Sequence, residues 1–157
     1  MKIAPVIRKL KADITQEAKS RAFKAANALR SAELEVLRGQ RTGRVYRKPH
    51  TKRATYRASA PGEAPAVRSG HLRMSWRTIT GSEKSGKDTI ITPAIHTTVP
   101  YAPILQNGFK GSVSRTSKKG KVYTVNVKLE PRPFDEPIKE KAMPAIIKIF
   151  ETPYLNK

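Results

Sequence analysis

The sequence predicts an α+β fold in which a long N-terminal helix and a C-terminal helix pack on a small antiparallel sheet. Apolar residues recur at intervals of three and four at both ends of the chain, and alternating segments with hairpin-like connections lie between them. A basic, proline-containing stretch separates the first helix from the strands. The length of 157 residues is typical of one domain. We expect a single domain over residues 1–157, divided into a helix (1–38), an extended basic arm (39–70), a β-sheet region (71–130) and a helix (135–151).

The first predicted helix begins near Pro5 and ends before Gly39. Its apolar stripe consists of Ile3, Ile7, Leu10, Ile14, Ala18, Ala22, Ala25, Leu29, Ala32 and Val36. A helix of about 33 residues is about 50 Å long at 1.5 Å per residue, which is more than one small core covers. Part of the helix should therefore project or pack on a second subunit; the alternative is that it lies across its own sheet, and both can hold.

The arm changes the character of the chain. No acidic residue occurs between Glu35 and Glu63, while basic residues recur throughout. Prolines at 49, 61 and 65 favour extended backbone. A segment this long without regular structure is usually functional or disordered.

The middle of the chain predicts strands. Residues 72–80 fit a strand, or one helical turn that leads into a strand, and a turn follows at residues 81–87. Residues 89–99 are rich in β-branched side chains, and Pro93 favours an edge position. We expect an Asn-Gly turn within residues 100–109 and a second basic loop at residues 110–121.

The strand expected at residues 122–129 alternates clearly, and a proline-rich break follows it. Asp135 is then suited to cap the final helix. The residues expected to form either the core or a structural scaffold are Leu72, Trp76, Ile91, Tyr101, Leu105, Val125, Phe134 and Ile146.

The sequence contains no pattern of residues that indicates catalysis. The chain has no cysteine, which excludes disulfides and thiolate nucleophiles, and its three histidines have no metal-ligand spacing. The adjacent carboxylates at 135–136 are explained by a helix start, and residues 81–87 lack the pattern of a phosphate-binding loop. We expect no enzyme activity, no cofactor, no metal and no small-molecule substrate.

The formal charge of +20 points to an anionic partner: nucleic acid, an acidic protein surface or an anionic membrane. No apolar run approaches the roughly 20 residues of a membrane span, and the N-terminus lacks a signal-peptide core. We therefore expect no membrane partner. The basic segments fit three uses, which are phosphate binding, solvation of a loop and docking on acidic protein.

Four short motifs occur in order along the chain. They are Ser59–Ala66 (SAPGEAPA), Ser69–Ser75 (SGHLRMS), Tyr101–Gly108 and Arg132–Phe134 (RPF). Together they resemble the small neck or tail-completion proteins of long-tailed bacteriophages, which are often described as minor tail components. The resemblance covers residues 1–150, and the heavy basic charge and the longer arm depart from it.

The resemblance implies a structural virion protein that joins head and tail as an oligomeric ring. Its implied partners are copies of itself, other neck, connector and tail proteins, and packaged DNA; it would be made in the cytoplasm of the bacterial host. The alternative is a basic accessory protein that binds nucleic acid.

Two sets of residues follow from these arguments. The expected contacts with partner proteins or DNA are Arg41, Arg44, Arg47, Lys48, Lys52, Arg53, Arg57, Arg68, Lys118, Lys119 and Lys121. The expected scaffold residues of the resemblance are Pro61, Gly62, Gly70, Leu72, Tyr101, Gly108, Arg132, Pro133 and Phe134.

Overall fold

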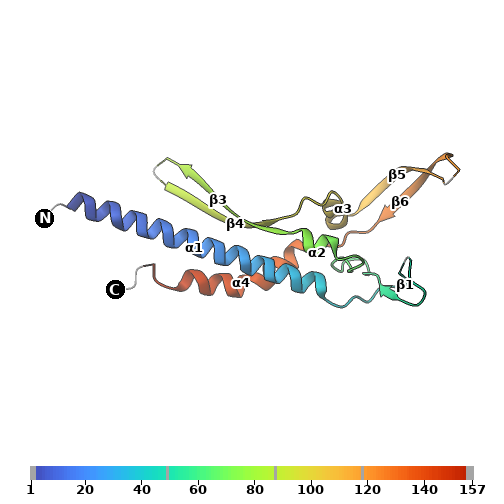
Figure 1. Ribbon diagram of the computed structural model, residues 1–157, viewed down its shortest axis with the longest axis horizontal. Helices are drawn as coiled ribbons and strands as arrows, with labels where there is room; N and C mark the ends of the chain where they lie inside the picture. The colour runs from blue at the N-terminus through green and yellow to red at the C-terminus, as the bar shows by residue number, and fades with distance from the viewer. Residues whose placement is uncertain (1–2, 49, 87, 118, 155–157) are drawn as a thin grey trace. The chain divides into compact units, whose positions relative to one another are not determined.

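The structure is a computed structural model that describes residues 3–48, 50–86, 88–117 and 119–154. It confirms the α+β class, with a long N-terminal helix, a C-terminal helix and small antiparallel sheets (Figure 1). Lys118 and Pro49, which the sequence singled out, lie outside the described residues.

Contacts within the chain define two compact units. The first unit consists of Met1–Leu34, Trp76–Thr97 and Ile138–Lys157, and the second of Glu35–Ser75 and Thr98–Pro137. Each unit is described by itself below. That residues 1–157 form a single domain stays a prediction.

Helix α1 runs from Ile3 to Arg38, as the apolar spacing predicted. Its buried apolar residues in the first unit are all alanines: Ala22, Ala25, Ala26 and Ala32. The larger apolar residues of its N-terminal half are exposed, Ile7 by 60%. Within the described part of the first unit, the apolar residues at the start of the predicted stripe are therefore partly exposed to solvent. This exposure is expected for a helix that is longer than the core it packs on.

The first unit also contains a hairpin and most of the last helix. Strand β3 (Arg77–Ser85) pairs antiparallel with β4 (Asp88–His96), and Pro93 stands opposite Thr80 in a strand that is an edge. Helix α4 (Asp135–Glu151) lies alongside α1, where the Arg21 guanidinium donates 2.6 Å to the Pro153 carbonyl just beyond it (Figure 1). The predicted turn at 81–87 is wrong, because residues 81–85 continue β3 opposite β4.

The second unit contains the remaining elements. They are β1 (Val45–Arg47), β2 (Thr55–Arg57), α2 (His71–Ser75), α3 (Ala102–Asn107), β5 (Phe109–Thr116) and β6 (Val122–Leu129). The turn of α2 that leads into β3 matches the second of the two alternatives predicted for residues 72–80. The Asn-Gly turn is wrong: Asn107 ends α3 and Gly108 follows it with φ 76°.

The second basic loop is also assigned differently by the structure. Residues 110–116 belong to β5, which pairs with β6 from Phe109↔Leu129 to Thr116↔Val122. The connection is therefore confined to residues 117–121. Lysine and glycine lower strand propensity, but the strongly β-prone partner strand supplies the ladder that holds them.

The strands form three separate two-stranded sheets rather than one sheet, within the part of the chain that the structure describes. Isolated two-stranded ribbons are marginally stable in water. Each ribbon must therefore gain stability from what packs against it.

The predicted core residues are mostly half-buried. Phe134 is buried, at 2% exposure, but Tyr101 is 40% exposed, which rules out the core and leaves only the scaffold role expected for it. Leu72, Trp76, Ile91, Leu105, Val125 and Ile146 lie between these extremes. In the first unit the buried alanines of α1 form the core together with Ile138 and Ala142 of α4. Glu33 of α1 is also fully buried there, and it forms an ion pair with Arg30.

Candidate interaction site: the basic arm and its pocket

The arm is not extended throughout, which corrects the sequence prediction. Its central part folds into the β1–β2 hairpin, in which Tyr46 stands opposite Tyr56 and the two rings stack at 5.9 Å. The Lys48 amide donates to the Ala54 carbonyl (2.8 Å), and the Ala58 amide donates to the Arg44 carbonyl (2.9 Å). Cross-strand aromatic pairs and β-branched residues stabilise such a ribbon.

Glu63 fastens the two ends of the hairpin together. Its carboxylate accepts hydrogen bonds from the Thr42 hydroxyl (2.6 Å), the Thr42 amide (3.1 Å) and the Ala60 amide (2.8 Å). These hydrogen bonds, that of the Thr42 hydroxyl first, lower the pKa of Glu63 from its usual value. The segments before and after the hairpin are thereby held side by side.

Arg41 has a structural role that the sequence did not predict. Its guanidinium donates to the Val36 carbonyl (2.7 Å) at the end of α1 and to the Pro65 carbonyl (3.2 Å). It thus satisfies a terminal helix carbonyl and ties the helix end to the chain beyond the hairpin. Burial lowers the pKa of Arg41 from its usual value.

The other predicted contact residues of the hairpin are mostly open to solvent. Arg47, Lys52 and Arg53 are exposed, and Lys48 is half-buried. The Arg44 guanidinium lies 5.7 Å from the Tyr46 ring, and Arg57 donates to the Gly43 carbonyl (3.3 Å). At the far end of the β5–β6 ribbon, Lys119 and Lys121 are exposed as well.

The four motifs of the resemblance are all part of the second unit, and three of them are joined by hydrogen bonds. The Gly62 amide donates to the Pro131 carbonyl (3.1 Å), and the Arg132 amide to the Leu105 carbonyl (2.8 Å). Arg132 also donates through its guanidinium to the buried Ser59 hydroxyl. The Phe134 amide donates to the Gln106 side chain (2.9 Å).

Glycines set the backbone at two of these places. Gly62 and Gly70 both have φ 81°, a value that glycine adopts without strain. The Gly70 carbonyl accepts from the Met74 amide (2.9 Å) and so starts α2. Pro61 is exposed and Pro133 half-buried.

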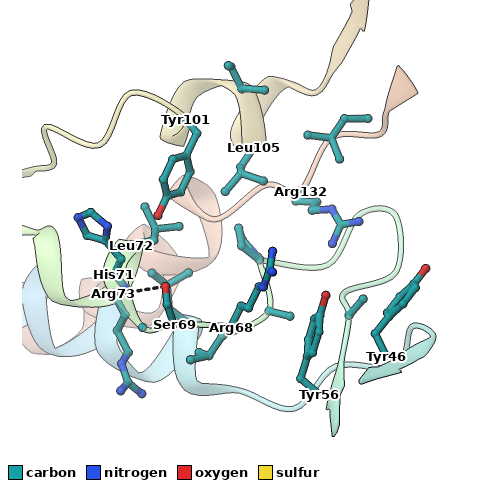
Figure 2. Close-up of a pocket in the computed structure, with 18 residues that line it drawn as sticks. Tyr46, Tyr56, Arg68, Ser69, His71, Leu72, Arg73, Tyr101, Leu105 and Arg132 are labelled. Atoms are coloured by element: carbon teal, nitrogen blue, oxygen red, sulfur yellow. Dashed lines mark hydrogen bonds between the residues drawn. The ribbon is translucent and has the colours of Figure 1, made fainter. Parts of the chain in front are cut away.

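A pocket of about 680 Å³ lies where these segments meet (Figure 2). Figure 2 shows Arg68 crossing between Tyr101 at one end and the Tyr46–Tyr56 pair at the other. The His71 ring meets the Tyr101 ring edge-on at 6.4 Å. The four motifs supply most of the wall, and the rest comes from the end of α1, the hairpin and the residue that follows it, residues 67–68 and the end of β6.

Sequence reasoning missed several residues that build this site. They are Ser59, Glu63, Gln106, Tyr46 and Tyr56. Glu63 carried a usable signal, because it is the only acid between Glu35 and Glu83. The partners of Ser59 and Gln106 lie 73 and 28 residues away in sequence, and no local pattern could indicate them.

The Glu63 hydrogen bonds make the arm sensitive to acid. A carboxyl group whose pKa is lowered by folding stabilises the fold at a pH above its unfolded-state pKa of 4.5. This stabilisation is lost as the pH falls through the lower pKa of the folded state. We expect Glu63→Gln to lower the urea midpoint at pH 7, with the difference from the wild type shrinking at about pH 3.5. Amide exchange at Thr42 and Ala60 should follow the same course. Glu83→Gln removes a charge from an exposed strand and is the control; an equal, pH-independent effect of both variants would contradict the role of Glu63.

Comparison with known proteins finds no match: no family model fits the chain, and no curated protein or solved structure is significantly similar to it. Two further features are absent from the described residues. None of their helices is long and apolar enough to cross a membrane, and no three of their histidine or carboxylate side chains cluster as metal ligands would.

Proposed function

We propose that this chain is a structural protein of a tailed-phage virion, a component of the neck or tail-completion complex that joins head and tail as an oligomeric ring. The observation that carries the proposal is the meeting of the four motifs in the second unit. The segments 59–66, 101–108 and 132–134 hydrogen-bond to one another, and the segment 69–75 lines the same pocket. Motifs that build one shared site support the resemblance better than four separate matches would.

The exposed apolar surface supports an assembly role. In the first unit Val6, Ile7, Leu10 and Ile14 lie exposed along α1, and their exposures range from 38% to 60%. In the second unit the β5–β6 ribbon exposes Val122 by 64% and Tyr123 by 45%. Exposed apolar side chains that recur at helical spacing, as at positions 7, 10 and 14, are typical of surfaces that bind other proteins.

The strand edges support the same role. Each described ribbon has two strands, so its outer backbone groups are open to pairing with another chain. Strand addition between copies would complete the ribbons, and repetition around a ring would multiply weak contacts into avidity. The exposed lysines and arginines suit acidic faces of adjoining proteins and the DNA that passes the neck.

The direct test is the position of the chain in an intact particle. The experiment adds an epitope tag to the gene that encodes this chain, in its native host. Tailed particles are then purified on a density gradient, and the tag is located by immunogold electron microscopy. We expect label at the head–tail junction, several copies in each particle by quantitative mass spectrometry, and separate heads and tails when the gene is deleted.

Complete particles without the gene, or label found only in the soluble fraction, would contradict the proposal. The alternative, a nucleic-acid-binding accessory protein, predicts tight binding to bare duplex DNA that weakens steeply with salt. Retention on preformed tails at moderate salt favours the neck role.

A further inference from the structure

The pocket of the second unit combines positive charge with an apolar wall. Arg68, Arg73, Arg132 and His71 are among the 18 described residues that line it, and none of the 18 is an acid. The Nε atoms of Arg73 and Arg132 are buried and have no hydrogen-bond partner within the described residues. The Arg132 guanidinium donates through Nη1 to Ser59, but an N–H group that is buried without an acceptor is costly, so an anionic group from outside would be favoured here.

The rest of the wall would hold an apolar side chain. Its members include Leu37, Val67, Leu72, Ile104, Leu105 and Leu129. Figure 2 shows Leu105 from α3 and Leu72 from α2 on the same side as the Tyr101 ring. The volume of about 680 Å³ falls within the usual range of ligand sites, and it has room for a few residues of peptide.

Peptide fits this wall better than nucleic acid does. Single-strand binders offer free aromatic faces along a basic groove. Here the Tyr46 and Tyr56 rings stack on each other, and the Tyr101 ring is met by His71. A guanidinium matches a carboxylate through two parallel hydrogen bonds, and the leucines accept the apolar side chains that a phosphate backbone lacks.

The charge of the chain indicates where the peptide comes from. A second copy has 12 acidic residues against 32 basic ones and so offers few segments that are acidic overall. A different, acidic protein provides the complementary sign.

We propose that this pocket binds a short segment of another protein in which acidic and apolar residues alternate, with a carboxylate held by Arg68 and Arg132. The inference deepens the assembly role and rests on it for the source of the segment. The binding itself is a property of the isolated chain, so it can be tested apart from any particle.

The experiment uses the full chain and a fluorescein-labelled peptide that contains three glutamates and two leucines, followed by fluorescence anisotropy. We expect saturable binding that weakens about tenfold or more for the matched peptide with glutamine in place of glutamate. Arg68→Gln should weaken binding similarly, whereas Arg115→Gln, on the exposed face of β5, removes the same charge and should change binding less than twofold.

A second pair of variants keeps the test independent of arginine. Val67 lines the pocket and is 38% exposed, and Val122 is 64% exposed on β6. Val67→Asp places a carboxylate beside Arg68 and should abolish binding, while Val122→Asp should leave it unchanged. The fold of each variant is checked by circular dichroism.

Three results would overturn the inference. Equal weakening by the pocket and control variants would show that binding follows net charge alone. Displacement of the peptide by a 12-residue thymidine oligonucleotide that itself depends on Arg68 would assign the pocket to nucleic acid. Failure of the peptide to bind, with the chain still present at the head–tail junction, would reject the pocket and leave the assembly role in place.

Discussion

Replacing Gly108 with alanine is expected to lower the free energy of unfolding by about 3 kcal/mol or more. Gly108 has φ 76° and ψ 179°, a combination that is essentially restricted to glycine. A Cβ atom there would lie 2.7 Å from the Leu129 carbonyl oxygen and 3.0 Å from the Pro131 ring. Because the nearest of these is backbone at the end of β6, neither α3 nor β6 can move aside without losing its hydrogen bonds.

Gly62 provides the matched control. It also has a positive φ, 81°, but a Cβ atom there would meet nothing within 4 Å. Gly62→Ala should cost only the backbone strain, about 1 kcal/mol. The measurement is urea unfolding of both variants, followed by near-ultraviolet circular dichroism; equal losses of stability in the two would show that the close approach at Gly108 is not what restricts the position.

The two long helices could be predicted because their signals are local. Apolar spacing of three and four runs through Ile3–Arg38 and Asp135–Glu151, and each helix ends where its periodicity ends. The short helix α3 was mistaken for a turn. Pro103 is compatible with a helix start, and the Asn-Gly pair that suggested a hairpin turn is the helix end.

The strands were harder to predict where composition and pairing disagree. Residues 81–85 and 110–116 are rich in glycine, serine and basic residues, which locally favour a loop. Their partner strands, β4 and β6, contain β-branched residues and hold them in register. Whether a segment forms a β-strand depends on the strand it pairs with as much as on its own sequence.

The candidate site could likewise be predicted from the sequence only in part. Its basic residues follow from composition, and most of those in the hairpin are exposed as expected. Arg41 looks the same in sequence but is engaged with the Val36 and Pro65 carbonyls. Whether a charged side chain faces solvent or the chain itself depends on groups that come close only on folding.

The β1–β2 hairpin gives the largest expected effect on assembly. Reversing the charge of three exposed hairpin residues, by Arg47→Glu, Lys52→Glu and Arg53→Glu, should reduce the yield of complete particles about a hundredfold or more. Each reversal replaces attraction to an acidic neighbour with repulsion, and the loss is repeated in every copy of the proposed ring. The measurement is plaque titre with electron microscopy of the particles, after complementation of a gene deletion.

The matched control reverses three exposed helix lysines, by Lys19→Glu, Lys24→Glu and Lys148→Glu, and should assemble nearly normally. A stronger variant replaces residues 45–57 with two glycines, which the 2.9 Å hydrogen bond between the Ala58 amide and the Arg44 carbonyl makes feasible. The deletion must spare Arg41 and Thr42, because they hold the end of α1 and the Glu63 carboxylate. Both hairpin variants should keep the helical circular dichroism signal of the wild type. Normal titres for the charge-reversed hairpin would remove it from the contacts of the assembly, whichever neighbour it was expected to meet.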